Sequence, residues 1–105
     1  MIGLDGKTVY EDCESSKNSK IDSIARWAHD AGKSVGMITT TRITHASPSA
    51  IYAHSPSRDW EVFDGKVFNE THYKQGCRDI ASQLVDNATY INVSLKIVNP
   101  NYLNL

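Results

Sequence analysis

The chain has 105 residues, of which 40% are hydrophobic, so its size and composition fit a single domain with one core. Eleven basic and twelve acidic residues give a formal net charge of −1, which provides no electrostatic basis for binding nucleic acid, an anionic membrane or an acidic substrate. The apolar and aromatic content is too high for a disordered chain.

Features of secreted proteins occur without an export signal. The first residues lack the basic and apolar regions of a signal peptide, and no later apolar run is long enough to cross a bilayer. Two cysteines and three N-x-[ST] sequons are nevertheless typical of the secretory pathway; the sequon asparagines, which are equally explained as unmodified surface residues, are Asn69, Asn87 and Asn92. This conflict suggests that the chain is part of a longer protein.

The first half of the chain predicts a helix followed by a strand. Apolar residues recur at helical spacing over residues 21–31, Ser19 with Asp22 resembles a capping box, and Gly32 is placed to end the helix. The run SVGMITT, residues 34–40, is typical of a buried strand in a parallel sheet. A helix followed by a strand predicts an α/β fold.

The second half continues the alternation. Ser47 as N-cap with Pro48 in the first helical position predicts a short helix over 47–54. Residues 58–73 mix polar and apolar side chains and are interpreted as a long surface excursion with partial packing. A second amphipathic helix is then predicted from Cys77 to Asn87, and residues 89–95 predict another strand.

The loop after the first strand is the predicted location for chemistry. Ligands of open α/β sheets bind beyond the carboxyl ends of the strands, and residues 41–47 lead from such an end into a helix. The candidates His45, Ser47, His54 and Arg58 also have ordinary explanations: a loop histidine, a helix cap, a packing residue and a solvated charge. The two histidines do not have a known zinc spacing.

A longer pattern resembles one family. The run GKSVGMITTTRITHASPSAIYAHSPSRDW, followed later by QGCRDIASQLV, is similar to the animal-type alkaline phosphatases. The resemblance implies that residues 1–93 are a partial domain, a fragment of a three-layer α/β/α sandwich around a mainly parallel sheet. Residues 94–105 form a divergent tail, explained either by intron read-through or by a lineage-specific extension.

The resemblance also implies a chemistry. The family hydrolyses phosphate monoesters through a phosphoserine, with two zinc ions and one magnesium ion at the site. Ser47 matches a magnesium ligand, His45 a residue that approaches magnesium through its water shell, and Arg58 the arginine that binds phosphate. Cys13 and Cys77 match a disulfide, the alternative being two independent thiols. Family members are usually homodimers, extracellular or membrane-anchored.

Several parts of that site have no match in the chain. The nucleophilic serine and the zinc ligands of the family lie outside the matched segment, and Asp5 and Ser15 do not replace them. The chain alone is therefore expected to be inactive. Two alternatives stay open: a non-catalytic phosphate- or metal-binding module, and a small disulfide-linked secreted domain with a fortuitous resemblance.

Overall fold

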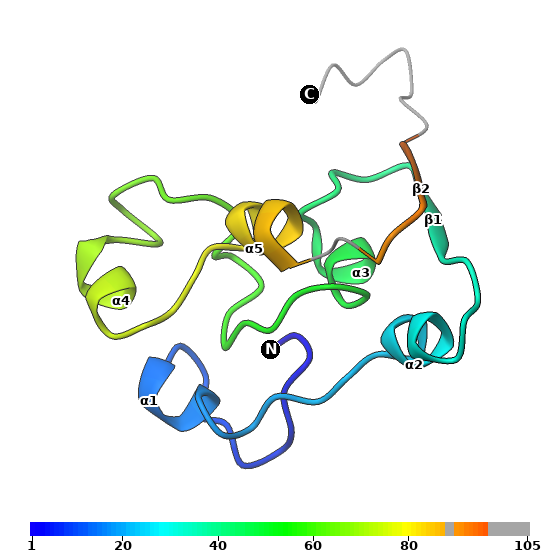
Figure 1. Ribbon diagram of the computed structural model, residues 1–105. Coiled ribbons are helices and arrows are strands. Elements are labelled where there is room, and N and C mark those ends of the chain that lie inside the picture. Colours follow the sequence, from blue (N-terminus) through cyan, green and yellow to red (C-terminus); the bar gives the residue numbers. More distant parts are fainter. Residues whose placement is uncertain (88–89, 97–105) are drawn as a thin grey trace.

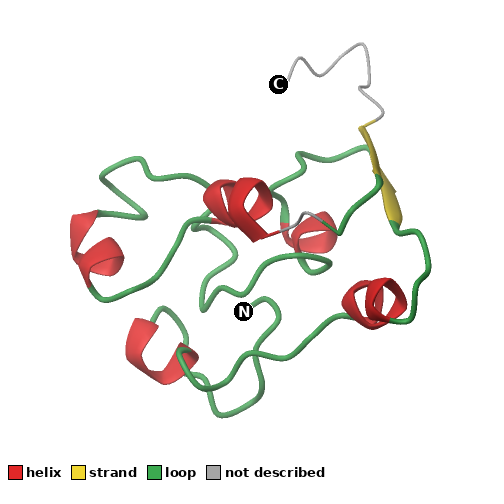
Figure 2. Cartoon of the chain, in the orientation of Figure 1, coloured by secondary structure: helices red, strands yellow, loops and turns green. Residues whose placement is uncertain are grey.

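The computed structural model describes residues 1–87 and 90–96. Within these ranges short helices and strands are joined by long loops, as Figures 1 and 2 show. In chain order the elements are α1 (Cys13–Ser16), α2 (Ile24–Asp30), β1 (Gly36–Thr39), α3 (Ala46–Ser49), α4 (Glu70–Lys74), α5 (Ile80–Asn87) and β2 (Val93–Lys96). None of the described helices is long and apolar enough to span a membrane.

β1 and β2 pair in parallel, which confirms the predicted pair of strands. The register runs from Gly36 opposite Val93 to Thr39 opposite Lys96. The first strand begins two residues later than predicted and the second four residues later. The prediction that the first strand is buried is wrong. Its side chains alternate between faces, so Met37 is 6% exposed on the core side and Ile38 is 70% exposed on the other.

α2 is shorter than the helix predicted over 21–31. The expected cap at Ser19 and Asp22 is wrong, because Ser23 is the N-cap and its hydroxyl accepts a hydrogen bond from the first turn. None of the residues of α2 is buried. The helix contacts the core only partly, through Ala25 and through Arg26 and His29, which lie against the ring of Tyr90.

The predicted end of α2 at Gly32 is confirmed. Gly32 has a φ of +82°, in the left-handed region that glycine tolerates. Its N–H donates to the carbonyl of His29 at 2.9 Å, and the N–H of Lys33 donates to that of Ala28 at 2.9 Å. These two bonds form a Schellman motif, which satisfies carbonyl groups that the last turn leaves without partners.

α3 begins earlier and ends sooner than predicted. Its N-cap is His45, which makes no side-chain capping bond, so the prediction that Ser47 is the cap is wrong. Ser47 and Pro48 lie inside the first turn instead. Proline is tolerated there because the first N–H groups of a helix have no intrahelical partner.

The partial packing predicted for segment 58–73 is confirmed. Trp60 and Phe68 are each 1% exposed, whereas Val62, Phe63 and Val67 remain at the surface. The helix α4 was not predicted from the sequence. It is fixed by a capping box in which Asn69 accepts from the backbone N–H of His72 and His72 accepts from the N–H of Asn69.

Two separate clusters form the core. The first lies beneath β1 and contains Ile2, Met37, Tyr52, Ala53, Ile80 and Tyr90. The second contains Cys13, Trp60, Phe68 and Cys77. Cys13 and Cys77 form a disulfide with a Cα–Cα distance of 5.7 Å, which confirms the expected pairing.

The disulfide belongs to the second cluster and not to the one beneath β1. It joins α1 to the loop before α5, which begins only at Ile80, three residues after Cys77. The chain is helical from there as far as Asn87, where this described range stops.

Candidate functional site

The β1–α3 loop, residues 40–45, turns immediately after β1. The hydroxyls of Thr39 and Thr41 lie 2.8 Å apart, and the N–H of Thr41 donates to the Thr39 hydroxyl at 3.1 Å. Further along, the N–H of His45 donates to the carbonyl of Arg42 at 2.9 Å. These local bonds bring the loop to the start of α3, where His45 and Ser47 lie.

The two residues predicted near magnesium have different environments. Ser47 is exposed in the first turn of α3, whereas His45 is half-buried at the N-cap. The Nδ1 atom of His45 is buried and has no hydrogen-bond partner among the described residues. Buried polar atoms usually have hydrogen-bond partners, so the lack of one at this nitrogen makes His45 a candidate for contact with a bound group.

Arg58, the predicted phosphate ligand, is exposed on a well-anchored segment. Ser55 pairs with Ile2 through two backbone bonds of 2.8 and 2.9 Å, and its hydroxyl donates to the carbonyl of Ser57 at 2.6 Å. Ser57 is 0% and Trp60 1% exposed on either side of Arg58. Among the described residues, none of the ion pairs includes Arg58.

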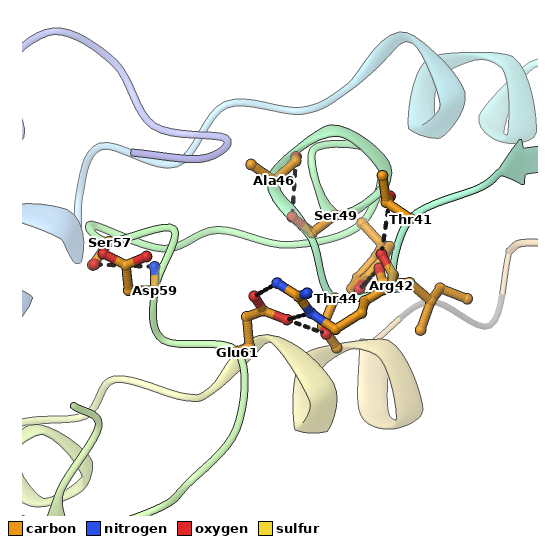
Figure 3. Close-up of polar contacts among 10 residues, drawn as sticks. Thr41, Arg42, Thr44, Ala46, Ser49, Ser57, Asp59 and Glu61 are labelled. Carbon is orange, nitrogen blue, oxygen red and sulfur yellow. Dashed lines mark hydrogen bonds and ion pairs between the residues drawn. The ribbon is translucent and has the colours of Figure 1, made fainter. Parts of the chain in front are cut away.

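Glu61 connects the Arg58 segment with the β1–α3 loop. Its carboxylate accepts two bonds from Arg42, from Nη2 at 2.7 Å and from Nε at 3.0 Å, and a third from the Thr44 hydroxyl at 2.6 Å (Figure 3). The hydrogen bonds from Arg42 hold the pKa of Glu61 below its usual value, and the same pair raises the pKa of Arg42. The carboxylate is therefore ionised at neutral pH.

Tyr52 supports the same loop from within the core. Its hydroxyl donates to the carbonyl of Ile43 at 2.7 Å. Burial, and secondarily the charge of Glu61, raises the pKa of Tyr52. The phenol therefore keeps its proton and remains a donor over the whole physiological pH range.

His54 has a structural role, as its ordinary interpretation suggested. Its Nδ1 lies 2.7 Å from the carbonyl oxygen of Gly3. Its backbone N–H donates to the side-chain oxygen of Gln83 at 2.8 Å, and its carbonyl accepts from the amide nitrogen of the same Gln83 at 3.0 Å. These bonds attach the segment before Arg58 to the N-terminus and to α5.

The described side chains offer individual metal ligands but no complete set of them. The Ser47 hydroxyl is an oxygen donor of the type that Mg²⁺ accepts. Within residues 1–87 and 90–96, however, no group of three or more His, Cys, Asp or Glu side chains could hold a metal ion. The described residues thus do not complete a magnesium or zinc site.

Sequence reasoning missed Arg42, Thr44 and Glu61. Arg42 occurs in the Thr-Thr-Thr-Arg turn, which was noted only as part of a family pattern, and Glu61 lay in a presumed surface excursion. The partners are 17 and 19 residues apart, so no helical or strand periodicity marks them. The one available signal was a pair of acidic residues, Asp59 and Glu61, on either side of Trp60, and this pattern does not indicate which of them pairs with Arg42.

The comparisons with known proteins agree with the sequence pattern. The family model for alkaline phosphatase matches residues 1–96. The chain is 48% identical to the tissue-nonspecific isozyme of alkaline phosphatase from Gallus gallus over 94 residues, which are 90% of this chain and 18% of that protein. It is 48% identical to the Homo sapiens isozyme over 92 residues, 88% of this chain and 17% of that protein.

A more distant relative gives the same result. Alkaline phosphatase from Gadus morhua is 41% identical over 92 residues, 88% of this chain and 19% of that protein. The chain thus spans less than a fifth of the length of these curated relatives. Such identity over nearly all of the chain excludes a fortuitous resemblance, and the chain belongs to the alkaline phosphatase family.

Proposed function

We propose that this chain forms part of a metal-dependent phosphatase that hydrolyses phosphate monoesters, and that Arg58 binds the phosphate. The observation that carries the proposal is the state of Arg58. Its side chain is exposed and makes no ion pair with a described carboxylate, while buried Ser57 and Trp60 fix the backbone around it. A guanidinium offers two parallel N–H donors to non-bridging phosphate oxygens, so this arrangement suits an anion.

Ser47 and His45 have the second role in this proposal. Ser47 is a magnesium ligand through its hydroxyl, and His45 lies close to the same ion without binding it directly. The exposure of Ser47 and the unpartnered Nδ1 of His45 support this assignment. In this proposal magnesium and zinc are cofactors of the whole protein. The described residues complete a site for neither metal, so the remaining ligands would come from the rest of that protein.

We infer that the chain is inactive on its own. Neither a serine in the family's nucleophile context nor a zinc ligand set is found in its sequence. A chromogenic phosphate monoester should not be hydrolysed above background by the 105-residue chain with added zinc and magnesium. Metal-dependent turnover by the chain would contradict this.

The larger fold and the cellular location of the whole protein are part of the proposal. Parallel sheets are normally covered on both faces, and a two-stranded pair is rarely stable alone, so β1 and β2 fit a larger three-layer α/β/α sandwich that residues 1–93 enter as a partial domain. The disulfide and the sequons at Asn69 and Asn92 support an extracellular or membrane-anchored location. The last two residues of the sequon at Asn87 and most of the tail, residues 97–105, lie outside the described residues.

The assignment of Arg58 is tested in a full-length alkaline phosphatase in which residues 1–92 of this chain replace the matching segment. Arg58→Ala should lower kcat/KM about ten- to a few hundred-fold, because each hydrogen bond to a charged group contributes roughly 1.5–3 kcal/mol. Its metal content should not change. Loss of metal with unchanged affinity for inorganic phosphate would contradict the assignment.

Ser47→Ala should behave differently in the same chimera. The half-saturating magnesium concentration should rise, and activity should return partly when magnesium is added in excess. Activity titrations with magnesium measure both effects. If magnesium dependence is untouched, Ser47 is not a ligand.

A phosphate-binding module without catalysis is the second candidate, favoured by the same exposure of Arg58. Binding of inorganic phosphate to the 105-residue chain, lost in Arg58→Ala, would support it. Phosphate affinity that appears only in the chimera would favour the enzyme segment.

A further inference from the structure

Glu61 is attached to a rigid part of the molecule. The residue before it, Trp60, is 1% exposed in the second core cluster. The carbonyls of Trp60 and Glu61 each accept a 2.9 Å bond, from the N–H groups of Ile80 and Ala81 at the start of α5. The backbone that carries the Glu61 carboxylate is therefore fixed by α5 and by the core.

The β1–α3 loop is held less firmly: Ile43 packs against the first core cluster, but among the described residues its hydrogen bonds other than those to Glu61 come from its own part of the chain. Thr39 and Tyr52, which hold the loop from either end, lie within the continuous stretch from β1 to the residues after α3. The bonds from Arg42 and Thr44 to Glu61 instead cross to the segment that carries Arg58. The donors, Arg42 and Thr44, lie on either side of Ile43, and Thr44 directly precedes His45.

We propose that Glu61 is a positioning residue that sets the spacing between the two halves of the phosphate site. One half is the β1–α3 loop with His45 and Ser47, and the other is the segment around Arg58, three residues before Glu61. The inference rests on the proposed function of Ser47 and Arg58. It goes further by assigning a role to a residue that touches neither phosphate nor metal.

The chemistry of the contact requires a carboxylate at this length. Three donors converge on two oxygens, and two of them come from one planar guanidinium, so the contact fixes both the direction and the distance of the loop. A glutamine retains one acceptor oxygen but loses the second and the charge. An aspartate retains both oxygens, but its shorter side chain does not reach the same position.

The test uses the chimeric full-length phosphatase described above. Misplaced catalytic groups cost up to about a hundredfold in rate, so Glu61→Gln should lower kcat/KM by roughly ten- to a hundredfold. It should also weaken inhibition by inorganic phosphate and raise the half-saturating magnesium concentration. The matched control is Glu70→Gln, which removes a surface ion pair with Lys74 of 3.3 Å and should change each constant less than about twofold.

A charge swap separates positioning from general destabilisation. Arg42→Glu alone should be impaired at least as much as Glu61→Gln, because it places two carboxylates opposite each other. The double variant Arg42→Glu/Glu61→Arg should regain activity, because it again pairs one guanidinium with one carboxylate at the same two positions. If the phosphate and magnesium constants of Glu61→Gln stay within twofold of the parent while Arg58→Ala weakens phosphate binding, the inference on Glu61 is wrong and the proposed function stands. If Arg58→Ala changes neither constant, the proposed function itself fails.

A second measurement needs no activity. In the oxidised 105-residue chain, the amide of His45 is bonded to the carbonyl of Arg42, so its hydrogen exchange reports on the loop. Glu61→Gln should accelerate this exchange without changing that of the Cys77 amide, which is bonded to His72 in the second cluster. Equal exchange at His45 in the two proteins would overturn the inference even if the chimera did not fold.

Discussion

At the scale of single residues, the ion pair of Arg42 with Glu61 has the least exposed carboxylate and the most hydrogen bonds among the described ion pairs. Glu61 is 22% exposed and accepts three hydrogen bonds, whereas other ion pairs such as Lys17 with Glu14 lie in solvent with side chains about half exposed or more. Exposed ion pairs contribute little, since water and salt screen them. The contact of Arg42 with Glu61 is thus the ion pair from which a measurable pH effect is expected.

We expect a comparison of Glu61→Gln with the parent chain to show this effect. The pKa of Glu61 is lower in the folded state than its usual value of 4.5, because Arg42 donates hydrogen bonds to it, so its contribution to the free energy of unfolding is present above that pH. It is lost as the pH falls through the folded pKa. Denaturant unfolding between pH 7 and pH 3 should show two stabilities that differ near pH 7 and converge in acid. A constant difference at every pH would contradict the assignment.

The residues of the site differ in how far the sequence could predict them. Ser47 and Arg58 were found because they lie in a long family-like run. Glu61 was not found, since it depends on Arg42 nineteen residues away and only the folded chain brings the two together. Local patterns report neighbours in sequence, whereas this contact depends on how α5 and the second cluster place the backbone.

At the scale of elements, two glycines with positive φ show how turns constrain the chain. Gly32 ends α2 with a φ of +82°, and a Cβ there would meet no atom within 4 Å. Gly3 has a φ of +60°, and a Cβ there would overlap the carbonyl oxygen of Ala53 and lie 2.9 Å from Nδ1 of His54. The two positions share the backbone cost of a side chain but differ in the space around it.

Alanine substitutions should separate these two costs. Gly32→Ala should lower the free energy of unfolding by about 1 kcal/mol, the cost of a left-handed residue. Gly3→Ala should cost clearly more, about 3 kcal/mol, because the Ala53–His54 backbone must also move. Chemical denaturation measures both, with Gly6→Ala as a control whose Cβ meets no neighbour. Equal losses at positions 3 and 32 would contradict the steric argument.

Predictions of whole elements succeeded where the signal was local. The glycine stop of α2 follows from adjacent residues and was predicted. The start of α3 was predicted too late, because a Ser-Pro pair fits inside the first turn of a helix as well as at the cap position. α4 was missed because its capping box uses Asn69 with a histidine in place of the usual glutamate or glutamine.

At the scale of the whole molecule, the second cluster depends on a covalent bond. It contains two aromatic side chains and the two half-cystines, and the ring centroids of Trp60 and Phe68 are 5.3 Å apart. The sequence could predict the pairing of the cysteines only through the family resemblance. It could not place the disulfide, because the burial of Trp60 and Phe68 beside it was not evident from their polar surroundings.

Reduction should destabilise the chain strongly. The bond closes a loop with a sequence separation of 64, for which chain entropy predicts a stabilisation of about 4 kcal/mol. Thermal unfolding followed by circular dichroism should shift to much lower temperature with reductant. The double variant Cys13→Ser/Cys77→Ser should resemble the reduced chain and not respond to reductant. Identical melting of the parent chain with and without reductant would contradict this expectation.

The parallel pairing of β1 with β2 also has a consequence for the order of events during synthesis on the ribosome. β1 leaves the ribosome more than fifty residues before its partner, whereas Cys77 emerges ahead of β2. The disulfide can therefore close before β2 is available to pair with β1, and Ile38, which is 70% exposed even in the paired strand, is accessible at that stage too. In an oxidising compartment, covalent closure would precede strand pairing, and the interval between them is when the nascent chain is most prone to associate with other chains.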